Sequence, residues 1–151
     1  ASGKQRQQQQ QQPSWTCVLG AGPELCKKHM GRALLLVYPD DFECSAESVA
    51  LKSLDCYAGS TVIHVGELFG SVRLMEHPWG RSSGDEFQVR LNNIYHKVLE
   101  VPVPSWPFSN DRLTVWRRKH PCITDDGVFG YVPPDEELDP VLAIPSMSHL
   151  L

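Results

Sequence analysis

Two short apolar runs, at residues 33–38 and 61–65, are the clearest feature of the hydrophobic pattern. Strands that are buried on both faces of a sheet read as such runs, and two parallel strands need a crossover connection between them, usually a helix. The segment between the runs has apolar residues at helical spacing, with Ser45 as a suitable N-cap and Gly59 at its end. The apolar positions of this helix are Ala46, Val49, Ala50, Leu54 and Tyr57. The pattern therefore predicts a β–α–β unit.

The pattern after this unit predicts one more helix and two more strands. Apolar residues follow one helical face over residues 85–96, and strand-like runs occupy residues 98–103 and 112–118. A short loop rich in turn formers joins these two runs, so we expect them to pair antiparallel. Before the first strand, a turn at residues 20–22 is expected to lead into a short helix that begins at Pro23.

Both ends of the chain differ in composition from its centre. Residues 1–14 are a glutamine tract with a basic flank, which cannot bury enough apolar surface to fold alone. Residues 120–151 are rich in proline and acidic residues, and we expect a tail with little structure of its own. Residues 15–119 therefore form the predicted domain. Because the chain begins with Ala1 rather than methionine, we expect a fragment or a processed product.

Composition narrows the class of protein but not its chemistry. With 41% hydrophobic residues among 151, the chain can bury the core of one domain. A net charge of −4 argues against nucleic-acid binding, and no apolar run is long enough to cross a membrane. The five cysteines form no CxxC pair and no metal-ligand spacing. We therefore expect no metal, no disulfide framework and a reducing, cytoplasmic location.

Together the elements predict an α/β fold with a partial Rossmann-like, three-layer sheet. Two parallel strands are followed by a C-terminal antiparallel strand pair, and helices cover the faces. In open α/β sheets, ligands bind at the carboxyl ends of the parallel strands. Asp40 and Asp41 follow the first strand and Glu67 follows the second, so these carboxylates are the candidate catalytic residues. Within the strands, His64 is expected to be a core histidine with its hydrogen bonds satisfied, and Trp116 a core aromatic.

Several segments resemble a known group of proteins. The sequences GPELCKKHMGRALLLVYP, GSTVIHVGE and DRLTVWRR are similar to the motifs of a poorly characterised eukaryotic and bacterial family. Its larger members look like class I S-adenosylmethionine-dependent methyltransferases, whose Rossmann-like fold also ends in an antiparallel strand pair. The resemblance covers residues 20–119. It implies transfer of a methyl group from S-adenosylmethionine to an unknown small-molecule or protein acceptor.

The resemblance also implies which residues bind the substrate. In many methyltransferases that modify nitrogen, an Asn/Asp-Pro-Pro-aromatic turn holds the target amine, and the Tyr38-Pro39-Asp40-Asp41 turn occupies the equivalent place. In this chain Asp40 replaces the second proline, and the aromatic residue precedes the proline. The residues implied to line the mouth of the pocket are Tyr38, Pro39, Trp79 and Trp106. Each candidate has a structural alternative, because turn acids also cap helices and aromatic residues near strand ends also pack in the core or a lid.

Two interpretations stay open. The family holds its cofactor with a glycine-rich loop and an acidic residue that ends the second strand of the complete domain, and neither is identifiable in this sequence. The chain is therefore either the C-terminal, substrate-side half of a methyltransferase-like domain or a non-catalytic α/β interaction or scaffold module. A hydrolase is not indicated, because the sequence has no GxSxG motif. In either case a half-sheet exposes one edge, so we expect the isolated chain to be unstable or to self-associate through residues 33–38.

Overall fold

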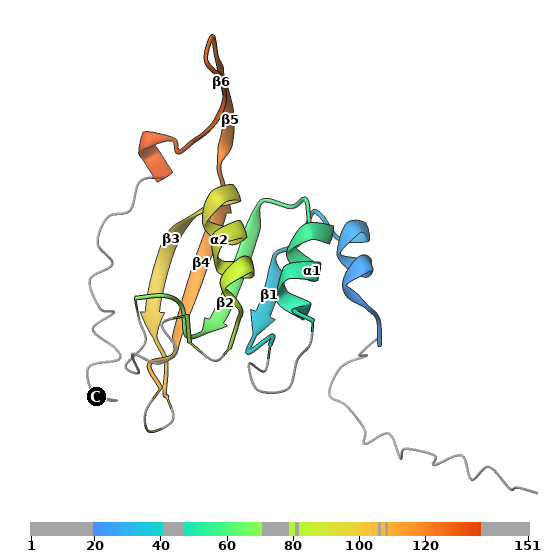
Figure 1. Ribbon diagram of the computed structural model, residues 1–151, viewed down its shortest axis with the longest axis vertical. Helices are drawn as coiled ribbons and strands as arrows, with labels where there is room; N and C mark the ends of the chain where they lie inside the picture. Colours follow the sequence, from blue (N-terminus) through green and yellow to red (C-terminus); the bar gives the residue numbers. More distant parts are fainter. Residues whose placement is uncertain are drawn as a thin grey trace, which may run out of the picture.

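The centre of the chain folds as the predicted β–α–β unit, followed by a helix and two further strands (Figure 1). The computed structural model describes residues 20–40, 47–70, 79–80, 82–105, 107 and 109–136. The elements in chain order are η1 (Pro23–Lys28, a 3-10 helix), β1 (Leu34–Val37), α1 (Val49–Cys56), β2 (Thr61–Gly66), α2 (Asp85–Ile94), β3 (Tyr95–Pro102), β4 (Arg112–Arg118), β5 (His120–Thr124), β6 (Gly127–Tyr131) and η2 (Pro134–Glu136, also 3-10). Neither α1 nor α2, nor any other helix in these ranges, has the length and apolar character needed to cross a bilayer.

The main sheet has four strands in the order β1-β2-β4-β3. Strand β1 pairs parallel with β2, whereas β4 pairs antiparallel with both β2 and β3. The last strand of this sheet is thus inserted between two strands that run in the same direction. The two predicted parallel strands and the predicted antiparallel pair are confirmed, and the fold is a mixed α/β fold.

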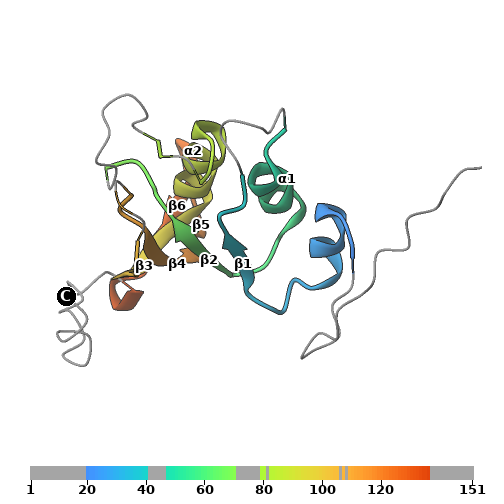
Figure 2. The same cartoon turned by 90° about the horizontal axis from the view of Figure 1, so that it is seen from below.

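Helices α1 and α2 lie on the same face of this sheet (Figure 2). Strands β1, β2 and β3 run in one direction and follow one another across the sheet, and right-handed crossovers that all proceed one way place their helices on one side. The predicted three-layer arrangement is therefore not confirmed for the described residues. The core between helices and sheet consists of Leu36, Ala50, Leu54, Tyr57, Val62, Phe87, Leu91, Tyr95 and Trp116, which confirms Trp116 as a core residue.

The helices are shorter than their apolar patterns predict. Helix α1 begins after Ser48, whose hydroxyl oxygen accepts the Leu51 amide hydrogen at 2.9 Å, and Val49 is 49% exposed rather than packed on the apolar face. The predicted cap Ser45 lies outside the described residues. Helix α2 ends at Ile94 because Tyr95 already belongs to β3.

The segment after Lys119 has more structure than expected. Strands β5 and β6 form an antiparallel hairpin, a separate sheet that projects from the end of β4 (Figure 1). Gly127 in its turn has a φ of +133°, a conformation that side chains rarely adopt. The expectation of a tail with little structure is therefore wrong for residues 120–136. Residues 1–14 and 137–151 lie outside the described part of the chain.

Candidate functional site

The carboxyl ends of β1 and β2 lie side by side because the two strands are parallel neighbours. Val37 is in register with Val65, and the Tyr38 amide donates to the Val65 carbonyl at 3.0 Å. The Asp40 amide donates to the Ser82 carbonyl at 3.1 Å, so the turn after β1 is tied to the loop before α2. Residues 38–40 follow β1, and Glu67 follows β2. The sequence predicts a site at this edge of the sheet.

Asp40 uses both carboxylate oxygens to cap helix α1. Its Oδ1 accepts the backbone amides of Val49 at 2.7 Å and Ala50 at 3.1 Å, and its Oδ2 accepts the Ser48 hydroxyl at 2.7 Å. The amides at the start of a helix have no partners within it, and a carboxylate there also interacts favourably with the helix dipole. The structural alternative for Asp40, a capping role, is thus present in the fold.

Glu67 is buried at 6% exposure and connects the end of β2 to the loop before β4. Its Oε1 accepts the backbone amide of Asn110 at 3.0 Å. Its own amide donates to the Ser82 hydroxyl oxygen at 2.9 Å, and that hydroxyl in turn donates to the Glu67 carbonyl at 3.2 Å. Gly80 has a φ of +78°, and a Cβ there would lie 2.5 Å from the Cβ of Glu67. Only glycine therefore fits beside this carboxylate without a shift.

Tyr38 has an unusual backbone conformation at the centre of this edge. Its φ of +44° makes it the one non-glycine residue with a positive φ among those described. Strained backbone of this kind persists only where surrounding structure holds it, and it is common at binding sites. The Tyr38 hydroxyl is hydrogen-bonded to the carboxylate of Asp111. Partial burial, this hydrogen bond and the negative charges of Asp111 and Glu67 together raise the pKa of Tyr38 to about 12.

Asp111 was not singled out from the sequence, although it completes the group. It is 2% exposed, and its Oδ2 accepts the Ser109 hydroxyl at 2.7 Å. The Asp111 amide donates to the Ser105 hydroxyl oxygen at 2.9 Å, so the turn before β4 is fixed by side chains. The sequence signal was an Asn-Asp turn directly before a strand, which is too common to identify a site. The carboxyl-end group, as we call Tyr38, Glu67 and Asp111, draws on β1, β2 and the start of β4.

His64 lies in the core beneath this edge, and its environment differs from the prediction. It is fully buried, and neither ring nitrogen has a hydrogen-bond partner within the described part of the chain. The prediction of a core position is confirmed, but the prediction of satisfied hydrogen bonds is wrong. Burial lowers the pKa of His64 to about 4, although the charge of Asp40 opposes this shift. The imidazole is therefore neutral at pH 7.

Of the remaining candidates, the structure describes Trp79 and Pro39, and neither joins the carboxyl-end group. Trp79 packs against Phe69, with 4.8 Å between ring centroids, and lines a separate cleft. Pro39 is half-buried in the turn after β1. Asp41 and Trp106 lie outside the described residues, so their predicted roles stay predictions.

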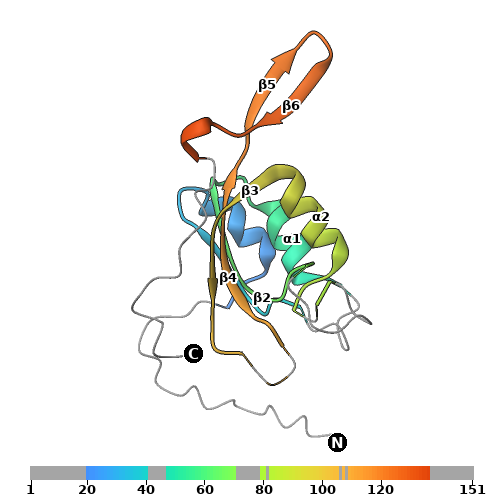
Figure 3. The same cartoon turned by 90° about the vertical axis from the view of Figure 1, so that its left-hand side faces the viewer.

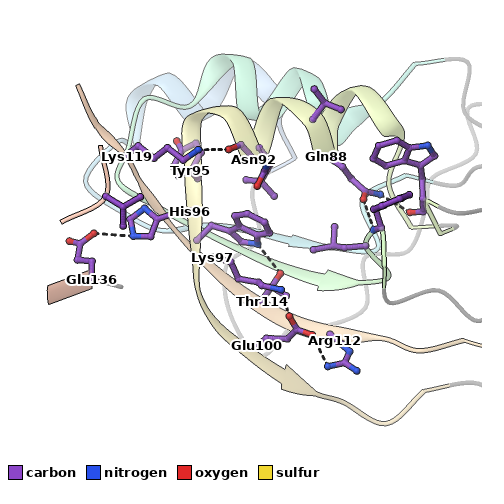
Figure 4. Close-up of a pocket in the computed structure, with 17 residues that line it drawn as sticks. Gln88, Asn92, Tyr95, His96, Lys97, Glu100, Arg112, Thr114, Lys119 and Glu136 are labelled. Carbon is purple, nitrogen blue, oxygen red and sulfur yellow. Dashed lines mark hydrogen bonds and ion pairs between the residues drawn. The ribbon is translucent and has the colours of Figure 1, made fainter. Parts of the chain in front are cut away.

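The separate cleft, about 690 Å³ in volume, runs between α2 and the outer strand β3 (Figure 4). Trp116 and Thr114 form part of its floor, where the indole N–H donates to the threonine hydroxyl oxygen at 2.9 Å. Glu100 accepts from Arg112 Nη1 at 2.6 Å and also pairs with Lys97. Burial alone would raise the pKa of Glu100, but these two cations lower it overall. The cleft thus holds one carboxylate paired with two cations, beside aromatic side chains.

Comparisons and metal geometry add no further assignment. In the ranges that the structure describes, no group of three or more histidine, cysteine or acidic side chains is arranged to hold a metal ion. No protein-family model, curated protein or solved structure matches this chain. The carboxyl-end group and the order of the strands are therefore the features of this molecule that bear on its function.

Proposed function

We propose that this chain is the substrate-side half of a methyltransferase-like domain, acting in methyl transfer from S-adenosylmethionine to an unidentified acceptor. The observation that carries the proposal is the carboxyl-end group: Tyr38, Glu67 and Asp111 converge where parallel strands end, and Tyr38 has a positive φ. Ligands of open α/β sheets bind at this edge. The strand order supports the same proposal, since parallel strands that finish in an antiparallel pair are also a feature of the methyltransferase fold.

The proposal assigns different roles to the predicted catalytic carboxylates. Glu67 and Asp111 are buried beneath this edge, and their negative charge would attract and orient an amine that accepts the methyl group. The Tyr38 hydroxyl stays protonated at neutral pH and is held by Asp111, so it presents an ordered aromatic ring beside the acceptor. Asp40 acts through the fold, because its carboxylate caps α1.

The proposal concerns the acceptor side alone. In the resembling family a glycine-rich loop and an acidic strand end hold the amino-acid part and the ribose of the cofactor, and the described residues include no equivalent of either. The residues present thus do not fit the cofactor by themselves, and no step of the reaction is assigned to it.

A non-catalytic interaction or scaffold module is the second candidate. The observation that favours it is that the carboxylates of Asp40 and Glu67 are already bonded to backbone amides of this chain. Acids that only hold loops together would be arranged in the same way. The two candidates differ in whether any ligand depends on Glu67 and Tyr38.

Calorimetric titration of S-adenosylmethionine separates the two candidates. The cofactor would be titrated into the 151-residue chain and into the longest natural product of its gene. Binding to the longer product alone supports a substrate-side half, and binding to neither supports the scaffold module. With a binding-competent product in hand, Glu67→Gln and Tyr38→Phe are expected to lower methyl transfer at least tenfold, while the exposed control Glu86→Gln leaves it unchanged.

A further inference from the structure

The cleft beside α2 lies over β3 and β4, the last two strands in the order of the main sheet. Helix α2 runs along these strands on the helix-covered side (Figure 3). The volume of the cleft, about 690 Å³, is in the range of sites that bind small molecules. Tyr38, Glu67 and Asp111 of the carboxyl-end group do not line it, so the cleft needs a role of its own.

A β-bulge brings two oppositely charged side chains of β3 to this cleft. In a regular strand Lys97 and Glu100 would point to opposite faces, because successive side chains alternate. The register shifts between Lys97 and Leu99, so Lys97 lies opposite Trp116 and Glu100 lies opposite Thr114. Because Trp116 and Thr114 are two residues apart on β4, they share one face. Lys97 and Glu100 therefore both lie on the helix-covered side, where each side chain is partly buried.

The cleft carries an excess of positive charge on an acidic protein. The described residues that line it include the cations Lys97, Arg112 and Lys119 and the carboxylates Glu100 and Glu136. Glu100 is shared by Lys97 and Arg112, so one of these two positive charges has no counterion among the described residues. The whole chain has a net charge of −4, opposite in sign to this local excess. An anion is therefore the ligand group that the cleft favours.

The other charged groups of the cleft have partners within the chain. Lys119 Nζ donates to the Asn92 carbonyl at 2.7 Å. Glu136 Oε2 lies 3.2 Å from His96 Nε2, close enough for an ion pair when the imidazole is protonated. Figure 4 shows His96 and Glu136 together at one end of the cleft. The unbalanced charge therefore belongs to the group around Glu100.

The opposite end of the cleft, where Figure 4 places Gln88, is aromatic. Phe69 and Trp79 line it with 4.8 Å between their ring centroids, and Phe69 is 62% exposed. The buried Gln88 fixes the backbone of both residues. Its Oε1 accepts the Phe69 amide at 2.8 Å, and its Nε2 donates to the Trp79 carbonyl at 2.6 Å. An exposed ring on a backbone that is already fixed can stack on a planar ligand at a low cost in entropy.

We propose that this cleft binds a planar aromatic compound that carries one anionic group. The ring of the ligand stacks on Phe69 and Trp79, and its anion pairs with Lys97 and Arg112 through charge-assisted hydrogen bonds. An aromatic carboxylate and a nucleoside monophosphate share this chemistry. The inference does not depend on the proposed methyltransferase function.

NMR titrations of the complete 151-residue chain test the proposal. The probes are naphthoate and adenosine monophosphate, each compared with its uncharged analogue, naphthamide or adenosine. The indole N–H resonances of Trp79 and Trp116 are expected to shift and saturate with at least one anion, and its analogue should bind about tenfold more weakly. Tighter binding of naphthoate would identify a carboxylate ligand, and tighter binding of adenosine monophosphate a nucleotide. No saturable shift at millimolar anion, or equal affinity for an anion and its analogue, would overturn the proposal.

A substitution at Lys97 tests the contribution of charge. Lys97→Met leaves Glu100 balanced by Arg112 alone, so the anion and its uncharged analogue are expected to bind equally. The control Lys28→Met removes an exposed charge of η1 outside the cleft and should keep the preference for the anion. The same preference in both variants would contradict the role of the group around Glu100.

A substitution at Phe69 tests the contribution of stacking. Phe69→Ala is expected to weaken the anion and its analogue alike, by about fivefold or more. The control Phe129→Ala removes an equally exposed class of side chain from the hairpin and should change neither affinity. Thermal melting checks that both variants stay folded. Unchanged affinities in Phe69→Ala would remove the aromatic end of the cleft from the site and overturn the proposal.

Discussion

Asp40 shows how one side chain can be ambiguous in the sequence and specific in the structure. Its position after an apolar strand suits a substrate-binding acid, yet its three hydrogen bonds all go to Ser48, Val49 and Ala50 at the start of α1. Tyr38, two residues earlier, has the strained backbone and the buried partner Asp111. At the residue scale, the turn after β1 thus combines a structural acid with a site-facing aromatic residue.

Replacement of Asp40 by alanine is expected to lower the free energy of unfolding by about 1–2 kcal/mol, the usual cost of losing a helix cap. Asp40→Asn keeps an acceptor and should cost less. The control Asp55→Ala removes an exposed acid that pairs with Arg90 and should change stability by less than about 1 kcal/mol. Urea unfolding measures all three, and equal losses for Asp40→Ala and Asp55→Ala would contradict the capping role.

His64 makes stability depend on pH. Because burial lowers the pKa of His64 to about 4 in the fold, the unfolded chain binds a proton more readily between about pH 6.5 and pH 4. The stability contributed by neutral His64 is complete above pH 6.5 and falls by about 3 kcal/mol as the pH drops to 4. His64→Leu should flatten this part of the profile, measured by urea unfolding at a series of pH values. An unchanged slope would show that other groups cause the dependence.

At the scale of elements, β4 is paired on both sides in the main sheet, as β2 is. It pairs with β2 and β3. Its last residue, Arg118, forms hydrogen bonds at one end of the core. Arg118 donates to the carbonyls of Gly59 at 3.0 Å and Tyr57 at 3.0 Å and to the Tyr95 hydroxyl at 2.6 Å. Its guanidinium also stacks on the Tyr95 ring, 4.7 Å from the ring centroid. The adjacent Arg117 is exposed and bonds only to the Thr61 hydroxyl among the described contacts.

These neighbouring arginines form a matched pair for mutation. Arg118→Ala removes the side-chain donor to the Tyr57 carbonyl and the Tyr95 hydroxyl, and one of two donors to the Gly59 carbonyl, so we expect a loss of about 2–3 kcal/mol in thermal or urea unfolding. Arg117→Ala, with the same change of charge, is expected to cost less than about 0.5 kcal/mol. A similar loss for both would mean that net charge, rather than the contacts of Arg118, decides the effect.

At the scale of the whole molecule, β1 remains an edge strand, and its outer side has no partner among the described residues. Exposed edges with apolar side chains tend to pair with other chains. Leu35 and Val37 are both more than half exposed at this edge. Self-association through residues 33–38 therefore stays a prediction, and it would involve the unpaired backbone of β1.

Sedimentation velocity over a hundredfold range of concentration would measure this self-association. We expect a weight-average mass that rises with concentration for the natural chain. Leu35→Lys places a charge on the edge, and such charges block edge pairing in natural sheets, so this variant should remain monomeric. Val128→Lys, on the exposed hairpin, is the control and should associate as the natural chain does.

The sequence predicted the elements better than their contacts. Strand β4 has the predicted bounds, and β1 and β2 differ from theirs by one or two residues, because buried runs and turn formers are local signals. The hairpin β5–β6 was missed because Pro121 and exposed side chains conceal its alternation. The single helical layer depends on strand order, the capping role of Asp40 on a helix that begins nine residues later, and the environments of His64 and Asp111 on the residues packed around them. None of these is encoded in a local pattern.

The position of β4 between β2 and β3 also determines when the sheet can form during synthesis. Thr114 of β4 bonds to the carbonyl of His64, a residue 50 positions earlier, and β3 has no partner in the main sheet except β4. A nascent chain that has emerged from the ribosome only as far as residue 110 holds β1, β2 and an unpaired β3. The sheet cannot close until β4 inserts between strands made before it. Folding of this sheet is therefore delayed until β4 has been synthesised.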